Sequence, residues 1–307
     1  MSARRLAGRL LAVTLVVAAL LFLFRTITRN ADQLRAFDWS VDPGLLLLSL
    51  AAHVLVLAWG VVVWHRILVH TTHQRIGLLG LERISFLSSI ARYIPGKIWQ
   101  FVAAAQLAGR AGIAPAAILT SLALQLGFTL LAAAVVSIAT VPLPDAWPMG
   151  RAATVVLATG AAVLLSHPTV IRFALGVLPR ALHQDVIAWT GAWRESVVLL
   201  TLSIVSWLLY GGAFHLFVSS LVELPGSALL PLTGVNALSF LAGYLVFIAP
   251  AGLGARELAM TALLAPIVPS YVAAVVAILA RLWTIAAELV GAAIVLVLGR
   301  EKTGATD

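Results

Sequence analysis

The chain has 307 residues, of which 62% are hydrophobic and only 10% are charged. Soluble domains are about half apolar and about a quarter charged, so this composition excludes an ordinary soluble globular protein and predicts an integral membrane protein. The 20 Lys and Arg residues outnumber the 12 Asp and Glu residues, but they lie scattered between apolar runs. This scatter argues against a nucleic-acid partner and indicates a role in membrane topology. Cysteine is absent, which excludes disulfides and thiolate metal sites.

Six apolar runs are each long enough, or nearly so, to cross a bilayer as a helix, which takes about 20 residues. They cover residues 7–26, 44–64, 113–141, 151–167, 196–222 and 270–298. In the first run, Arg4, Arg5 and Arg9 come ahead of the apolar residues 10–24, which is the outline of a signal peptide, but no small-residue cleavage site comes after it. We therefore interpret it as the first transmembrane helix.

Two further stretches, residues 84–108 and 228–266, are apolar but are interrupted at their middles by Pro, Gly and charge. We expect each to form a broken helical hairpin that enters and leaves the membrane on one side. In both, a Ser-Phe-Leu triplet precedes the break, and a later proline, Pro115 or Pro269, opens a long apolar helix. The sequence therefore predicts an all-α bundle of about eight membrane segments, six of them full spans, with an inverted repeat.

The positions of the basic residues predict the orientation of these segments. Arginine and lysine gather before the first apolar run, after the second, between the fourth and fifth, and after the last. We therefore place both termini in the cytoplasm and the connection over residues 142–150 outside. Residues 1–307 are expected to form a single transmembrane domain without a separate soluble catalytic domain.

The first break combines polar and aromatic residues with helix-breaking ones. They are Arg92, Tyr93, Lys97 and Trp99, with Pro95 and Gly96 at the break itself. Placing Arg and Lys in a membrane is costly unless they meet an anion or reach the interface. A phosphate headgroup is a suitable anion, since Arg92 can donate two parallel hydrogen bonds and Lys97 can add a point charge. The alternative is that both side chains anchor a shallow turn at the cytoplasmic surface.

The second break also places charge beside helix-breaking residues. It holds Pro250, Gly252 and Gly254, followed by Arg256 and Glu257. The last apolar run holds Arg281 and Glu288, which are seven residues apart and so lie about two turns from each other on one helical face. We therefore expect pairs between helices, Glu257 with Arg281 or Arg256 with Glu288. Intramembrane charges are functional candidates, and a purely structural salt-bridge cluster is the alternative.

Three lone polar residues, His53, Gln125 and Asn236, lie within apolar runs, where we expect them to join helices by hydrogen bonds. The chain has no Walker loop, nucleophile elbow, paired-carboxylate motif or HExxH motif. We therefore predict no catalytic residues, no bound metal and no cofactor.

Two motifs carry a resemblance to a known family: ARYIPGKIW at residues 91–99 and APAGLGARE at residues 249–257. Through them, and over nearly its whole length, the chain resembles the flippase-like membrane family that includes the transmembrane flippase domain of lysylphosphatidylglycerol synthases. The resemblance implies an inner-membrane protein that moves a polar lipid, anionic or aminoacylated, between leaflets. Only a short charged tail follows Gly299 where the synthases carry a catalytic domain, so we do not expect this chain to synthesise the lipid.

The leading hypothesis is a lipid translocator whose two hairpins meet near the midplane of the membrane. Arg92 and Lys97 would receive the headgroup from the cytoplasmic side, and Arg256 with Arg281 would engage it from the outer half. Glu257 and Glu288 would hold these arginines in place when the site is empty. Two alternatives are a membrane scaffold for a glycosyltransferase or lipid synthase, and a membrane-embedded transferase acting on a lipid carrier. For the transferase, Glu82 is the only acid close to the first break.

Overall fold

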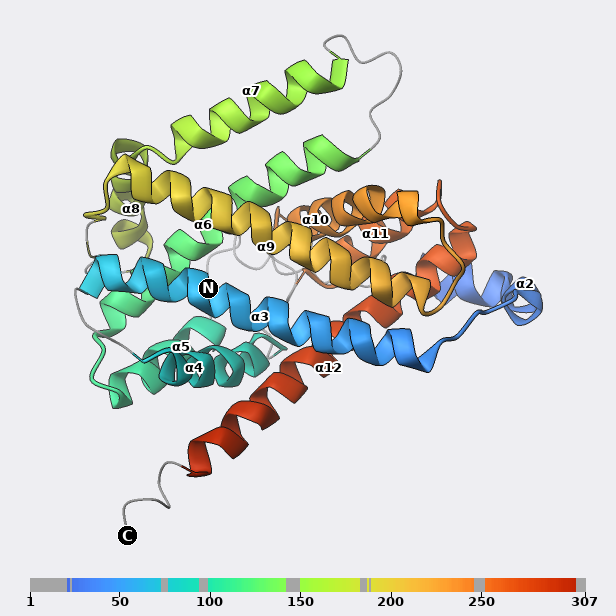
Figure 1. Ribbon diagram of the computed structural model, residues 1–307, viewed down its shortest axis with the longest axis horizontal. Coiled ribbons are helices and arrows are strands. Elements are labelled where there is room, and N and C mark those ends of the chain that lie inside the picture. The colour runs from blue at the N-terminus through green and yellow to red at the C-terminus, as the bar shows by residue number, and fades with distance from the viewer. Residues whose placement is uncertain are drawn as a thin grey trace, which may run out of the picture. The chain divides into compact units, whose positions relative to one another are not determined.

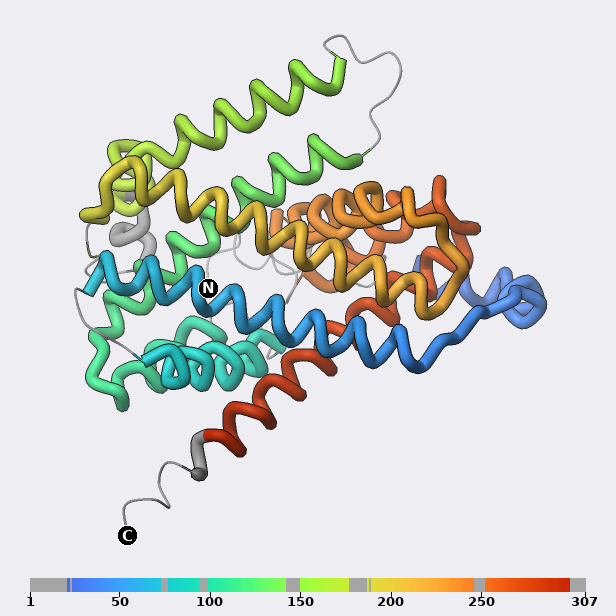
Figure 2. Tube along the Cα trace, in the orientation of Figure 1, coloured from blue at the N-terminus to red at the C-terminus, as the bar shows by residue number. Residues whose placement is uncertain are grey.

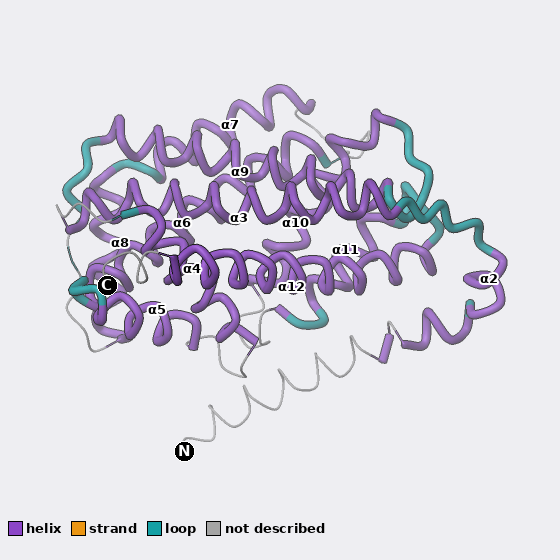
Figure 3. Tube along the Cα trace, turned by 60° about the horizontal axis from the view of Figure 1, so that its bottom comes forward, coloured by secondary structure: helices purple, strands orange, loops and turns teal. Residues whose placement is uncertain are grey.

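The computed structural model describes residues 21–22, 24–72, 77–93, 99–141, 150–182, 187, 189–245 and 252–301. Every regular element in these ranges is a helix, as Figure 3 shows, which confirms the predicted all-α class. The helices are α2 (Ala31–Ala36), α3 (Pro43–Thr72), α4 (Leu78–Ile90), η1 (Ala91–Tyr93), α5 (Trp99–Arg110), α6 (Pro115–Thr140), α7 (Gly150–Leu165), α8 (Pro168–Leu182), α9 (Trp193–Ser219), η2 (Gly226–Ala228), α10 (Leu229–Leu245), α11 (Ala255–Leu264) and α12 (Ser270–Glu301).

Among the described residues, five helical segments are long and apolar enough to cross a bilayer. They are α3, α6, α9, the combined η2 and α10 segment Gly226–Leu245, and Ser270–Leu298 of α12. Helix α7 meets this test only together with α8, from which it is separated by a bend of 64° (Figure 2). The predicted runs at 44–64, 113–141, 196–222 and 270–298 are thus confirmed as helices that suit a membrane. The predicted first span, residues 7–26, lies mostly outside the described residues.

The chain divides into two compact units. One comprises Met1–His53, Val136–Asp145 and Leu208–Ile285, and the other comprises Val54–Val135, Ala146–Trp207 and Ala286–Asp307. Helices α3, α6, α9 and α12 contribute residues to both units. The first unit contains α10 and α11, and the second contains α4 and α5.

Both predicted broken stretches fold as pairs of helices that pack on each other, α4 on α5 and α10 on α11 (Figure 1). Helix α10 with η2 is itself long enough to cross a bilayer, which goes beyond the short arm expected of a re-entrant hairpin. The re-entrant arrangement, the total of about eight segments and the inverted repeat therefore stay predictions.

Local sequence signals account for where the long helices begin. Helix α3 is capped by Asp42, whose Oδ1 accepts hydrogen bonds from the backbone N–H groups of Gly44 at 2.8 Å and Leu45 at 3.0 Å. Helix α6 starts at Pro115, and α12 starts directly after Pro269, as the sequence predicted. Proline suits the first turn of a helix because the backbone N–H that it lacks would have no intrahelical acceptor there.

Large apolar side chains cover much of the outside of these helices. Leu55 of α3 is 70% exposed, and Leu245 of α10 is 79% exposed. Within the first unit, a core of buried side chains includes Phe214, Phe217 and Trp283. In water, so much exposed leucine would be unfavourable, whereas hydrocarbon accommodates it without cost. With the apolar spans, this pattern identifies a multi-pass membrane protein.

Candidate functional site

The second break comprises residues 246–254, between α10 and α11. Two glycines determine the backbone conformation of its described part. Gly252 and Gly254 have φ angles of 69° and 86°, a left-handed conformation that glycine adopts without a steric penalty. A Cβ atom on Gly252 would lie 2.7 Å from the carbonyl oxygen of Gly243, so the chain passes directly against α10. A Cβ atom on Gly243 would lie 2.9 Å from the Cβ of Arg256. Close backbone contact at these glycines therefore determines where Arg256 lies.

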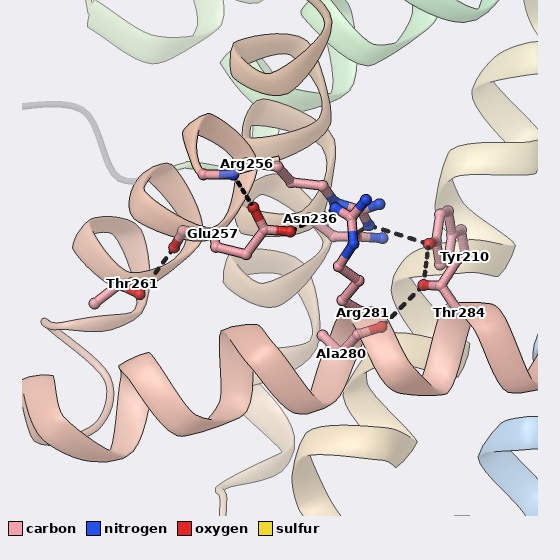
Figure 4. A network of polar contacts seen from close by, with 9 residues as sticks. Tyr210, Asn236, Arg256, Glu257, Thr261, Ala280, Arg281 and Thr284 are labelled. Atoms are coloured by element: carbon pink, nitrogen blue, oxygen red, sulfur yellow. Dashed lines mark hydrogen bonds and ion pairs between the residues drawn. The ribbon is translucent and has the colours of Figure 1, made fainter. Parts of the chain in front are cut away.

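Glu257 joins the start of α11 to α12 (Figure 4). Its Oε2 accepts a hydrogen bond from the backbone N–H of Gly254 at 2.7 Å, and its Oε1 accepts one from Nη1 of Arg281 at 2.7 Å. The side chains of Glu257 and Arg281 are only 5% and 17% exposed. A carboxylate in this position also interacts favourably with the helix N-terminus. The predicted pairing of Glu257 with Arg281 is thus confirmed.

Arg256, the neighbour of Glu257 on α11, contacts α9 and α10. Its Nη2 donates to the hydroxyl of Tyr210 at 3.2 Å and to Oδ1 of Asn236 at 3.3 Å. The Tyr210 hydroxyl also lies 3.5 Å from Oγ1 of Thr284 on α12. These contacts join residues of α9, α10, α11 and α12 in one network (Figure 4). Sequence reasoning missed Tyr210, although a single tyrosine next to two glycines in an apolar run is a signal that points to it.

The first break, residues 91–98 between α4 and α5, is tied to α12 through Glu288. Nη1 of Arg92 forms an ion pair with Oε1 of Glu288 at 2.9 Å, although the two groups are not aligned as a hydrogen bond. The Tyr93 hydroxyl donates a hydrogen bond to Oε2 of Glu288 at 2.8 Å. Glu288 is 2% exposed. Glu288 therefore has Arg92 and Tyr93 as partners from its own unit, and the other predicted pair, Arg256 with Glu288, stays a prediction. The spacing of residues in the sequence does not determine which helices adjoin α12.

Close packing of α4 on α12 positions this contact. The aromatic ring of Phe86 lies against Gly291, and a Cβ atom at Gly291 would overlap it. Phe86 is 5% exposed, so the ring has little freedom to move aside. Glycine at this position therefore allows α4, and with it the first break, to approach α12.

Several predicted site residues lie outside the described residues. They are Pro95, Gly96, Lys97 and Pro250. Trp99, the first residue of α5, is 43% exposed. It is therefore accessible from the surroundings of the helix, as a lipid contact requires.

The three lone polar residues behave differently from one another. Gln125 of α6 donates from Nε2 to the backbone carbonyl of Gly60 in α3 at 3.0 Å, the interhelical bond that was predicted. Asn236 joins α10 to α11 through Arg256. His53 instead packs against two aromatic rings. Its ring is stacked on that of Tyr210, with centroids 4.7 Å apart, and tilted against that of Trp283, with centroids 4.1 Å apart. Neither of its ring nitrogens has a hydrogen-bond partner among the described residues.

The network around α11 contains groups that can bind an anion. The described residues place two guanidinium groups, from Arg256 and Arg281, beside one carboxylate, that of Glu257. Guanidinium groups bind carboxylates and phosphates through paired hydrogen bonds. No cluster of three or more metal-ligating side chains occurs in the part of the chain that the structure describes.

Comparison with known proteins agrees with the motifs. A family model described as the lysylphosphatidylglycerol synthase TM region matches residues 9–291. The matched range contains both breaks and the four charged residues Arg256, Glu257, Arg281 and Glu288. A comparison with curated proteins found no match.

Proposed function

Because the chain belongs to the family of the lysylphosphatidylglycerol synthase TM region, we propose that it is a lipid translocator that moves, or helps to move, a polar lipid between leaflets. The lipid is anionic or aminoacylated, and the protein acts as a transporter rather than as an enzyme. It lies in the inner membrane of the cell with both termini in the cytoplasm. The placement of basic residues at the span ends supports this orientation.

The observation that carries the proposal is the buried charge network on α11 and α12. Ionisable side chains in membrane helices are costly, so they are rare away from functional sites. Here Arg256, Glu257 and Arg281 lie together within a unit whose helices are otherwise mainly apolar. The network has one more positive than negative charge, which favours an anionic headgroup. A structural salt bridge alone would need only Glu257 and Arg281.

Each predicted residue has a role in this proposal. Arg256 and Arg281 bind the headgroup at the second break, and Arg92, Tyr93, Lys97 and Trp99 bind it at the first. Glu257 and Glu288 hold arginines in place between transport events, a role supported by their short contacts with Arg281 and Arg92. Glycines with positive φ at the second break let backbone amides approach a ligand. The acyl chains stay in the hydrocarbon while the headgroup moves along the polar residues.

The proposal is tested by reconstituting the purified chain in liposomes that contain trace fluorescent phosphatidylglycerol or fluorescent lysylphosphatidylglycerol. An impermeant quencher added outside reports how fast lipid from the inner leaflet becomes accessible. We expect quenching beyond that of empty liposomes, and Arg256→Ala should slow it at least about tenfold, because a hydrogen bond to a charged group contributes about 1.5–3 kcal/mol.

The matched control is Arg66→Ala. Arg66 also pairs with a glutamate, Glu195 at 3.1 Å, but it is half exposed and lies outside the network. This variant should transport lipid at the wild-type rate. A folded wild-type protein that moves none of the lipids tried would refute the proposal and favour a scaffold that serves a lipid-modifying enzyme or glycosyltransferase. Loss of folded protein in Arg256→Ala would assign this residue a structural role.

A further inference from the structure

Buried hydrogen-bonding groups without partners gather beside Arg256. Within the described residues, these are both ring nitrogens of His53, Nδ2 of Asn236 and Nε1 of Trp283. His53 and Asn236 are 0% exposed and Trp283 is 5% exposed. A buried polar group that has no partner lowers the stability of a protein, so each such group calls for an explanation.

These three side chains form one continuous cluster with the network around Arg256. The His53 ring packs against both Trp283 and Tyr210, whose own ring centroids are 6.1 Å apart. Tyr210 and Asn236 both accept hydrogen bonds from Arg256. We call His53, Asn236 and Trp283 the donor cluster. It extends the polar region from α11 to α10, α12 and the first half of α3.

Most polar groups of the donor cluster are donors. The amide nitrogen of Asn236 and the indole nitrogen of Trp283 can only donate, and a neutral imidazole offers one donor and one acceptor. Arg256 beside them donates and carries a positive charge. A partner for this set must therefore bring several acceptor oxygens and negative charge. A phosphate ester fits this requirement, whereas an ammonium group would bring more donors and a repelled charge.

We infer that the donor cluster binds the phosphate of the transported lipid, with Asn236, Trp283 and His53 donating to its oxygens beside Arg256. This inference rests on the proposed lipid transport and adds the chemical group that is selected at this site. The site therefore recognises the phosphodiester that anionic and aminoacylated phospholipids share, and lipids without phosphate are poor ligands. A free phosphate ion carries the same oxygens, so the test separates the two sources.

The test compares two buried tryptophans of matched exposure. Trp283→Phe removes an indole N–H that has no partner among the described residues, whereas Trp207→Phe removes one that donates to the carbonyl of Thr129 at 3.0 Å. Trp207 is 4% exposed, against 5% for Trp283. The full chain in detergent is titrated with dihexanoylphosphatidylglycerol, inorganic phosphate or dihexanoylglycerol, and the rise in unfolding temperature gives the affinity of each.

We expect dihexanoylphosphatidylglycerol to raise the unfolding temperature and dihexanoylglycerol to leave it unchanged. Trp283→Phe should weaken binding about tenfold, the equivalent of one hydrogen bond to a charged group. Trp207→Phe should bind like the wild type but unfold at a lower temperature without ligand. If Trp283→Phe does not fold, His53→Phe takes its place. This variant keeps an aromatic ring and removes both ring nitrogens, and we expect the same loss of affinity.

If inorganic phosphate raises the unfolding temperature and Trp283→Phe weakens this effect, the donor cluster binds phosphate oxygens, and it binds the free ion as well as the lipid. The inference would be overturned if dihexanoylglycerol bound as tightly as dihexanoylphosphatidylglycerol, or if Trp283→Phe bound dihexanoylphosphatidylglycerol as tightly as the wild type. Buried water would then be the partner of the donor cluster. Lipid transport in liposomes that depends on Arg256 but not on Trp283 would overturn this inference and leave the proposed function standing. Absence of transport by the wild type would instead overturn the proposed function.

Discussion

Replacing Glu257 with alanine tests whether its carboxylate holds α11 against α12. The substitution removes the acceptor of the Gly254 N–H and of the Arg281 guanidinium, both at 2.7 Å. Removing one partner of a buried ion pair costs about 3–5 kcal/mol, because the other charge stays buried and unpaired. Since Arg281 is only 17% exposed, we expect the free energy of unfolding to fall by about this amount. Glu257→Gln keeps an oxygen for Gly254 and should cost less.

A double-mutant cycle with Arg281→Met isolates the contribution of the pair. The double variant should lose less stability than the two single variants together, since no lone charge is left behind. The free energy of unfolding is measured by titrating mixed micelles with dodecyl sulfate and following helicity by circular dichroism. Losses that add within about 0.5 kcal/mol would refute the reasoning, because they would show that the two side chains do not interact.

Two glycine substitutions test how the helices approach one another. Gly291→Ala should lower the free energy of unfolding by about 1–3 kcal/mol through overlap with the Phe86 ring, and Phe86→Leu in the same chain should restore part of the loss. Gly252→Ala should cost at least about 1–2 kcal/mol because of its positive φ, whereas Gly60→Ala in α3, where a Cβ atom has open space, should be neutral or stabilising. The same titration measures both, and equal effects at Gly252 and Gly60 would contradict the backbone argument.

Features that depend on neighbouring residues along the chain were predicted correctly. Apolar runs of sufficient length indicated the long helices, and Pro115 and Pro269 marked where α6 and α12 begin. The pairing of Glu257 with Arg281 is not local in this sense, but it was also predicted, because a charged side chain in lipid needs a partner of opposite charge. Family membership was likewise carried by two local motifs.

The sequence by itself therefore determined the class of protein, its long helices and the residues whose charge needs a partner, because hydropathy and helix breaking act over short distances. Tertiary structure decided that Glu288 pairs with Arg92, that Tyr210 joins Arg256, and that His53 stacks instead of forming the predicted hydrogen bond. Apolar helix surfaces are chemically alike in lipid. Which of them meet is decided by close packing at small residues such as Gly243, and that packing selects the partner of each buried polar side chain.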